Sequence, residues 1–139
     1  MPLVTIHLRE GKAASHRRAI ADSVHQAMMD ALKIPSDDRF QVIVQHSPEN
    51  MIHDRVFFGI ERSDDSVFVQ VVINHRDPSQ KLKMYDLIVD NLAESPGIRK
   101  EDVFIGVVEV ARENWWAYAR HTDAPGPETR ATGPHHDTP

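Results

Sequence analysis

The chain has 139 residues, which is enough for one folded domain around a single core. Hydrophobic residues make up 40% of the sequence and charged residues 27%, as in ordinary soluble globular proteins, so disorder throughout is not expected. The net charge of −5 comes without a long run of Lys or Arg. A nucleic acid is therefore not an expected partner, because binding a polyanion requires a basic surface.

The absence of cysteine and the scattered positions of the histidines exclude several kinds of site. The sequence has no cysteine, which rules out disulfides, thiol nucleophiles and cysteine-bound metals. Of the nine histidines only His135 and His136 are adjacent, so no metal site is expected. No apolar stretch approaches the ~20 residues that span a bilayer, and the N-terminus lacks a secretory pattern, so we predict a cytoplasmic protein without a membrane partner.

The first third of the chain has the pattern of a strand, a helix and a second strand. Residues 2–8 alternate apolar and polar side chains, which is typical of a half-buried strand. Residues 13–32 carry apolar side chains at helical spacing and predict an amphipathic helix of roughly five turns. After a break at 35–38, alternation resumes over residues 40–45 and predicts a strand.

The middle of the chain is expected to hold a loop, a short strand and a central strand. Residues 47–55 are mostly polar and include Pro48, so they predict a loop before a short strand at 56–58. Residues 67–73 are almost continuously apolar, as expected of a mid-sheet strand covered on both faces.

A second helix and a last strand follow. Asp77 has the position of a helix N-cap, with Pro78 at the first helical position and Gln80 completing a capping box. Gly97 is expected to end this helix, and residues 103–110 predict the last strand. The predicted buried stripe of the helix consists of Leu82, Tyr85, Val89 and Leu92.

The two halves of the chain resemble each other at a constant offset of 64 residues. IPSDDRFQVIVQ, residues 34–45, lies over IRKEDVFIGVVE, residues 98–109. We therefore predict an α+β fold in which a tandem βαβ repeat, at about 2–46 and 66–110, forms one mixed sheet with two helices on one face. The domain is expected over 1–118, with a disordered tail at 119–139. The uncovered apolar sheet face predicts oligomerisation.

Pro2 opens the first predicted strand, where its missing N–H costs little. A small second residue allows removal of Met1, which leaves a secondary amine at the N-terminus. An α-amino group has an ordinary pKa of about 7.7 to 8.0, so this amine can act as a base, as an acid or as an imine-forming nucleophile, depending on its surroundings. Alternatively, Pro2 is a proline without a catalytic role.

Four segments together resemble the tautomerase superfamily, specifically the group similar to malonate semialdehyde decarboxylase. They are PLVTIHLREGK, IPSDDRFQVI, FGIERSDDSVFVQVVIN and GIRKEDVFIGVVEVARENW. The resemblance covers roughly residues 2–116. It implies a homotrimer of tandem βαβ protomers, no cofactor, and Pro2 as the catalytic proline at the bottom of an apolar pocket.

The resemblance also implies further site residues. Asp38 matches an aspartate that acts near the amine or on water, although it also fits a turn residue before the strand. Arg76 matches the second of two arginines that bind the substrate carboxylate, and Asn74 replaces the first. Trp115 matches a tryptophan that either walls the pocket or anchors the C-terminal segment. His75 is expected on the surface by strand alternation, next to Arg76.

Three functions fit these residues. The leading prediction is a tautomerase acting on 2-oxo acids such as arylpyruvates, with Pro2 as general base. The second is decarboxylation or hydration of a 3-oxo acid such as malonate semialdehyde. The third belongs to another class, a non-catalytic ligand-sensing or oligomerisation module, because paired βαβ units also build such domains.

Overall fold

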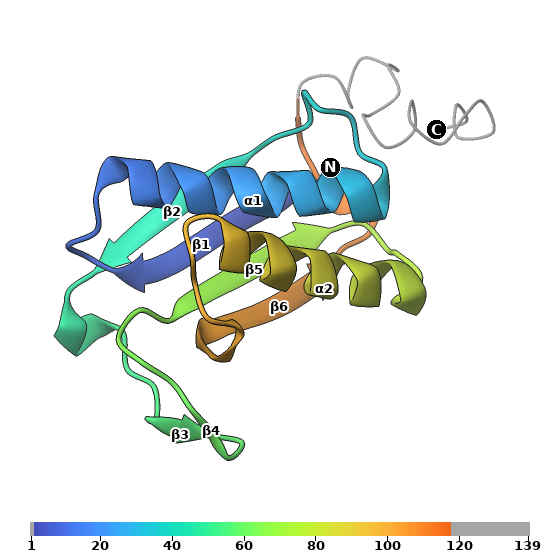
Figure 1. The fold of residues 1–139 in the computed structure, drawn as a ribbon. Coiled ribbons are helices and arrows are strands. Elements are labelled where there is room, and N and C mark those ends of the chain that lie inside the picture. The colour runs from blue at the N-terminus through green and yellow to red at the C-terminus, as the bar shows by residue number, and fades with distance from the viewer. Residues whose placement is uncertain (1, 118–139) are drawn as a thin grey trace.

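A computed structural model of the chain describes residues 2–117, which form two βαβ halves joined by a small hairpin (Figure 1). The first half consists of β1 (Leu3–Arg9), α1 (Ala14–Leu32) and β2 (Gln41–His46). The linking segment contains the 3-10 turn η1 (Pro48–Asn50), β3 (Val56–Phe57) and β4 (Ile60–Glu61). The second half consists of β5 (Val67–Ile73), α2 (Pro78–Glu94), η2 (Lys100–Asp102) and β6 (Val103–Glu109), followed by η3 (Arg112–Asn114).

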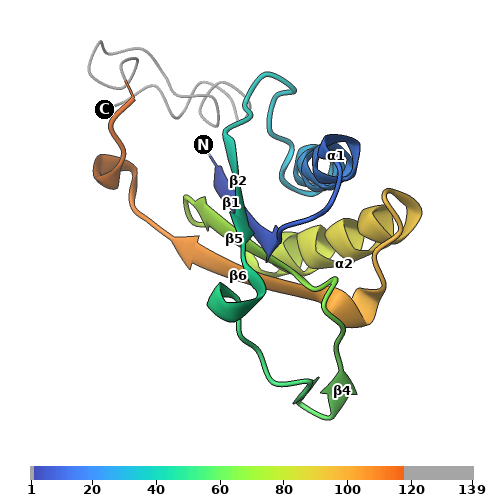
Figure 2. The same cartoon turned by 90° about the vertical axis from the view of Figure 1, so that its left-hand side faces the viewer.

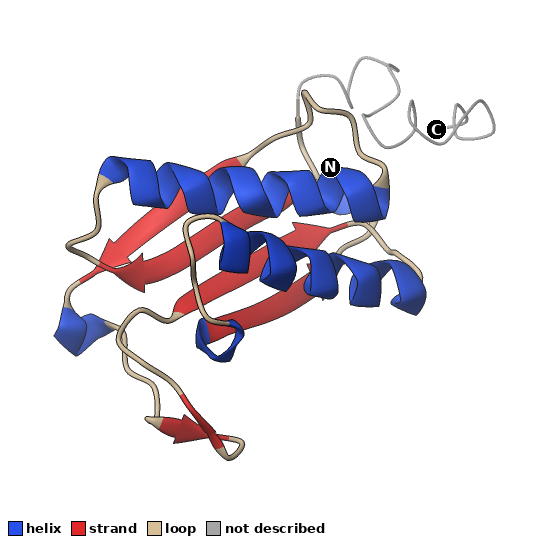
Figure 3. Cartoon of the chain, viewed as in Figure 1, coloured by secondary structure: helices blue, strands red, loops and turns tan. Residues whose placement is uncertain are grey.

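The two halves share one mixed four-stranded sheet of order β2-β1-β5-β6. Strands within a half are parallel, because a helix connects them, whereas β1 and β5 pair antiparallel at the centre. Both helices lie on the same face of the sheet (Figures 2 and 3). The predicted fold class is confirmed, and β5 takes the central position expected of its continuous apolar run.

The core fills the space between the sheet and the helices. Alternate residues of β1 point into it, and Val4, Ile6 and Leu8 are each at most 3% exposed. The buried side of α1 carries side chains at helical spacing. They are Ile20, Val24, Met28 and Leu32, together with three alanines.

The buried stripe predicted for α2 is partly wrong. The fully buried side chains are Met84, Ile88 and Leu92, spaced four residues apart, whereas Tyr85 and Val89 pack at the edge of the core. Leu82 is 61% exposed. It precedes Met84 by two residues and therefore lies about 200° around the helix, on the side that faces away from the sheet.

The ends of α2 are as predicted. The N–H of Asp77 donates to Oε1 of Gln80 at 3.2 Å in a capping box. At the other end the N–H groups of Gly97 and Ile98 both donate to the carbonyl of Leu92. Gly97 has a φ of 103°, a left-handed conformation that a glycine adopts without a steric penalty.

The face of the sheet opposite the helices is apolar and uncovered within residues 2–117. Its exposed side chains include Phe40 (64%) and Val42 (42%) of the first half and Phe104 and Val108 (44% each) of the second. An apolar surface of this kind is typical of a face that meets another protein chain.

Asp102 joins the start of β6 to the turn before β5. Its side chain accepts hydrogen bonds from the Ser63 N–H and the Ser63 hydroxyl, both at 2.7 Å, and from Arg99 Nε at 3.1 Å. Burial by itself raises the pKa of Asp102, but these hydrogen bonds outweigh it and lower the pKa to about 2. The ionised carboxylate therefore stabilises the fold.

Replacing Asp102 with Asn is expected to lower the free energy of unfolding by about 2 kcal/mol at neutral pH. Since the folded pKa lies below the ordinary value of ~3.9, this stabilisation is present above about pH 4 and is lost as the pH falls towards 2. Urea unfolding of both proteins at pH 7, 4 and 3 measures the difference. A difference that does not shrink below pH 4 would assign the loss to packing instead of charge.

Residue 118 and the predicted tail at 119–139 lie outside the described residues. Neither α1 nor α2, the two long helices between residues 2 and 117, is apolar enough to cross a membrane.

Candidate active site

The predicted site residues come from both halves of the chain and gather at one end of the sheet. Because β1 and β2 run antiparallel to β5 and β6, the amino ends of the first pair lie beside the carboxyl ends of the second. Leu3 pairs with Val72, and Ile73 pairs with Glu109. We call this the proline end of the sheet, defined by Pro2, Asp38, Asn74 and Arg76.

Pro2 is buried and directly precedes β1. The N–H of Val4 donates to the carbonyl of Phe40 at 3.0 Å, which joins the start of β1 to the chain that leads into β2. That chain carries Asp38. Pro2 has no backbone N–H that needs a partner, so a proline fits the position just before the strand.

Asp38 is only 8% exposed, and its N–H donates to the carbonyl of Pro35 at 3.1 Å. The residue therefore belongs to the turn before β2, as one interpretation of the sequence expected, and its carboxylate is buried at the same time. Burial lowers the pKa of Arg76, while the charges of Asp38 and Glu109 act in the opposite direction. Asp38 and Arg76 thus interact across the two halves of the chain.

Arg76 is held in place by its own loop and by β6. Nη1 of Arg76 donates to the carbonyls of Asn74 at 3.3 Å and His75 at 3.1 Å. The backbone N–H of Arg76 donates to Oε2 of Glu109 at 2.8 Å. A guanidinium carries five N–H donors. The two carbonyls accept from Nη1 alone, so the other nitrogen atoms of the Arg76 guanidinium retain N–H groups that can donate to a further acceptor.

Glu109 is a site residue that the sequence analysis missed. Its other oxygen accepts a hydrogen bond from Nζ of Lys81 on α2 at 3.1 Å, so it links the Arg76 loop to that helix. These two hydrogen bonds lower the pKa of Glu109 and keep it ionised. The sequence feature that could have pointed to Glu109 is a carboxylate at the last position of an otherwise apolar strand.

Asn74 and Trp115 each carry a buried N–H donor that meets no acceptor within residues 2–117. The donors are Nδ2 of Asn74, directly after β5, and Nε1 of Trp115, directly after η3. Leaving such a donor unpaired costs roughly 1 to 3 kcal/mol. Donors of this kind are therefore candidates for hydrogen bonds to a substrate.

His75 lies outside this group of residues. Its side chain is 78% exposed and lies 3.2 Å from Oε2 of Glu109, so the predicted surface position is confirmed. Within residues 2–117, no cluster of three or more His, Asp or Glu side chains is placed to hold a metal ion.

Two βαβ halves on one sheet, with a buried proline before the first strand, define a tautomerase-like protein. A family model described as tautomerase enzyme matches residues 38–116, and a second model of the same description matches residues 2–57. The chain belongs to the tautomerase family.

Individual relatives agree with this assignment. A probable tautomerase, YusQ of Bacillus subtilis (strain 168), is 33% identical over 83% of this chain and 91% of its own length. The crystal structure of FG41 malonate semialdehyde decarboxylase inhibited by 3-bromopropiolate is 33% identical, with a TM-score of 0.79 over 86% of this chain and 94% of that one. A fused 4-OT that forms a symmetric trimer shares the fold at 14% identity, with a TM-score of 0.69 over 84% and 91% of the two chains.

Proposed function

We propose that the protein is a homotrimeric tautomerase that interconverts the enol and keto forms of a 2-oxo acid such as an arylpyruvate, without a cofactor. The observation that carries the proposal is the proline end of the sheet. There a buried proline at position 2, a buried carboxylate and a partly buried guanidinium come together from three separate segments. They supply a base, an orienting acceptor and a cation for the substrate carboxylate.

The reaction requires one proton to move between carbon and oxygen. Once Met1 is removed, the amine lone pair of Pro2 takes a proton from C3 of the keto acid, and the electron pair moves onto the C2 oxygen. The same proton returns to the oxygen to give the enol, and the reverse sequence gives the keto acid. Burial disfavours the charged amine, so it keeps Pro2 available as a base near neutral pH.

Arg76 binds the substrate carboxylate, since a charged hydrogen bond to a guanidinium is stronger in a partly buried site. Nδ2 of Asn74 donates to the carboxylate or to the developing enolate oxygen, which satisfies a donor that has no acceptor within residues 2–117. Asp38 orients the substrate or a water molecule beside the amine. Trp115 forms a wall of the pocket, with its Nε1–H facing the bound acid.

The uncovered sheet face supports the trimer. Phe40, Val42, Phe104 and Val108 expose apolar surface on that face, and burying it between protomers removes this surface from water. A trimer is also the assembly of the fused 4-OT that shares the fold.

A second candidate function is decarboxylation of a 3-oxo acid, which the 33% identity to a malonate semialdehyde decarboxylase favours. Cationic Pro2 would then polarise the carbonyl, and Asp38 would activate water. Asn74 argues against this as the main activity, because it stands where the decarboxylase group has an arginine. With one cation fewer, the site holds a departing carboxylate less well.

The wild-type protein is therefore expected to ketonise enolised phenylpyruvate faster than it releases carbon dioxide from malonate semialdehyde. The expected difference in kcat/KM is at least about tenfold, since an asparagine in place of arginine at position 74 slows only the decarboxylation. The first reaction is followed by loss of enol absorbance, the second by a coupled assay for carbon dioxide. Faster decarboxylation would replace the proposal by the second candidate.

The Asn74→Arg variant tests the same preference in a second experiment, because it adds the guanidinium that the decarboxylase group has at this position. The substitution is expected to raise decarboxylation, whereas Asn74→Ala, which removes the amide without adding charge, is expected to lower tautomerisation and leave decarboxylation low. Equal behaviour of the two variants would show that position 74 does not select between the reactions.

A further inference from the structure

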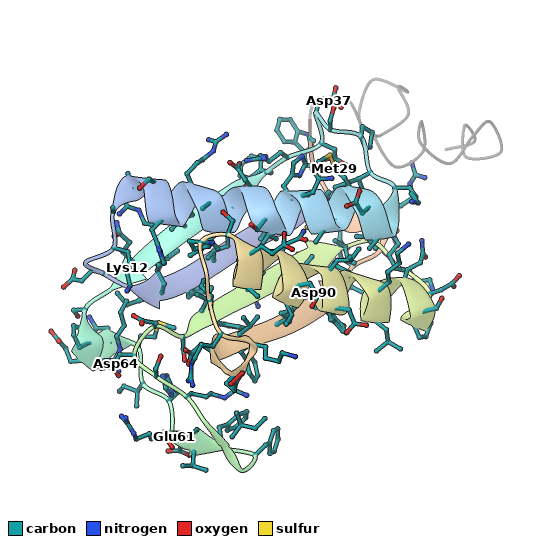
Figure 4. The ribbon with its side chains drawn as sticks, viewed as in Figure 1. Lys12, Met29, Asp37, Glu61, Asp64 and Asp90 are labelled. Carbon is teal, nitrogen blue, oxygen red and sulfur yellow. The ribbon has the colours of Figure 1, made fainter. Side chains whose placement is uncertain are left out.

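His25, on α1, is a buried polar side chain that the proposed reaction does not use. Among the histidines of residues 2–117 it alone is buried, with 4% of its surface exposed. A buried polar ring destabilises a fold unless it forms hydrogen bonds. Figure 4 labels Met29, one helical turn after His25, and Asp37, in the turn before β2, at the same end of the molecule. His25 therefore lies in the part of α1 that is near this turn.

The hydrogen bond of His25 reaches the turn that carries Asp38. Nε2 of His25 lies 3.0 Å from the carbonyl oxygen of Ser36. A carbonyl oxygen can only accept, so Nε2 carries the proton and donates. Ser36 belongs to the turn in which the N–H of Asp38 donates to the carbonyl of Pro35 at 3.1 Å. His25 thus holds the backbone two residues before Asp38.

A second hydrogen bond joins α1 to the same segment on the other side of Asp38. Nε2 of Gln41, the first residue of β2, donates to the carbonyl of Ala21 at 2.8 Å. Ala21 precedes His25 by four residues, so both contacts lie on one side of the helix. The segment that carries Asp38 is therefore attached to α1 both before and after this residue.

An ion pair at the surface adds a weaker contact. Nη1 of Arg39 lies 2.8 Å from Oδ1 of Asp22, and the two side chains are 29% and 52% exposed. Solvent screens a pair of this kind, whereas the ring of His25 is shielded from water. His25 therefore restrains the turn more strongly than Arg39 does.

We propose that His25 is a positioning residue for the tautomerase reaction, because it fixes the turn that places Asp38 at the proline end. This role rests on the proposed function, in which Asp38 orients the substrate or a water molecule beside the amine of Pro2. His25 lies outside the proline end and acts only through Asp38. A small displacement of an orienting group slows the chemical step without preventing binding. The hydrogen bond lies within one chain, so it does not depend on how protomers assemble.

The His25→Leu variant removes the donor and keeps a side chain of comparable bulk. Its kcat for ketonisation of enolised phenylpyruvate is expected to fall roughly 10- to 100-fold. Its KM is expected to change less than about twofold, since Arg76 and Asn74 bind the carboxylate from the other half of the chain. The kinetic constants are measured well below the unfolding temperature of each variant. A kcat equal to that of the wild-type protein would overturn the proposal.

His25→Gln tests whether the hydrogen bond itself is needed, because its amide N–H can reach the same carbonyl. Its kcat is expected to lie within about threefold of the wild-type value. If His25→Gln is as slow as His25→Leu, the donor is not what matters and the proposal fails.

Ser23→Ala is the matched control for a loss of stability. Ser23 is also buried on α1, and its hydroxyl donates to the carbonyl of Ser95 at 2.6 Å. Ser95 follows the carboxyl end of α2, whereas Arg76 precedes the amino end, so this hydrogen bond is remote from the proline end. The variant is expected to unfold at a lower temperature with an unchanged kcat. An equal fall in kcat in Ser23→Ala and His25→Leu would assign the effect to general loosening of α1 and overturn the proposal.

A double-mutant cycle with Asp38→Asn separates this role from the proposed function. In the Asp38→Asn background, His25→Leu is expected to lower kcat less than about twofold, because the group that His25 positions is already changed. An equal fall in both backgrounds would show that His25 does not act through Asp38. If His25→Leu does not fold, His25→Asn replaces it in the cycle, since the shorter side chain does not reach Ser36.

The two possible failures give different results. An impaired Asp38→Asn variant with a fully active His25→Leu variant would overturn the role of His25 alone. Unaltered kcat in Asp38→Asn would overturn the proposed role of Asp38 and, with it, that of His25.

Discussion

Replacing Pro2 with Ala is expected to lower kcat/KM for ketonisation of enolised phenylpyruvate at least about 100-fold, because general base catalysis typically contributes 10²- to 10⁴-fold. The variant retains a primary amine but loses the fixed ring that places the nitrogen. The rate is measured across pH, and the wild-type profile is expected to fall on the acid side as the amine becomes protonated. Intact mass must first show that Met1 is absent from both proteins.

Pro48→Ala is the matched control for this substitution, because Pro48 begins the exposed turn η1 far along the chain from Pro2. Neither substitution is expected to change the thermal unfolding midpoint by more than a few degrees, because Pro2 stands before β1 and Pro48 begins a surface turn, so neither belongs to the cluster of side chains between the sheet and the helices. Unaltered turnover in Pro2→Ala would contradict the mechanism. Retention of Met1 in the wild-type protein would exclude a catalytic amine and favour a non-catalytic ligand-sensing or oligomerisation module.

Replacing Arg76 with Ala is expected to raise KM for the same substrate about 10- to 100-fold, because a hydrogen bond to a charged group contributes about 1.5 to 3 kcal/mol. Arg76→Lys retains a charge but not the fork of donors, so it is expected to recover only part of the loss. Steady-state kinetics at fixed pH separate KM from kcat.

The control for Arg76 is Arg18→Ala, which removes an arginine that is exposed and paired with Asp22 within α1. Its kinetic constants are expected to match those of the wild-type protein. If Arg76→Ala lowers kcat and leaves KM unchanged, Arg76 acts on the transition state and not on binding of the carboxylate. That result would contradict the assigned role of Arg76 and leave the role of Pro2 intact.

The residues at the candidate site differ in how far the sequence alone revealed them. The alternating pattern placed Pro2 at the start of a strand, whereas Asp38 and Arg76 were identified as site residues by the resemblance to the tautomerase superfamily and not by the pattern. Glu109 was missed because a single charged residue at the end of an apolar strand is common and has no distinctive spacing. Its role depends on Arg76 and Lys81, two residues that only folding brings next to it.

The same distinction applies to the helices. The stripe of α1 was predicted correctly because its large apolar residues Ile20, Val24 and Met28 recur every four residues, so they lie on one side of the helix. In α2 apolar residues lie on more than one side of the helix. Periodicity alone therefore did not distinguish Leu82, which is exposed, from Met84, which is buried. The side that faces the sheet is decided by packing against it.

The sequence by itself determined the tandem βαβ architecture, because the period of apolar residues and the 64-residue repeat are local properties of the chain. It also placed Pro2 at the start of the first strand, directly before Leu3. Only the tertiary structure decided that β1 and β5 pair antiparallel at the centre of the sheet. That pairing brings the start of one half beside the end of the other and so forms the proline end of the sheet. Which segments meet is set by long-range packing, and no local pattern records it.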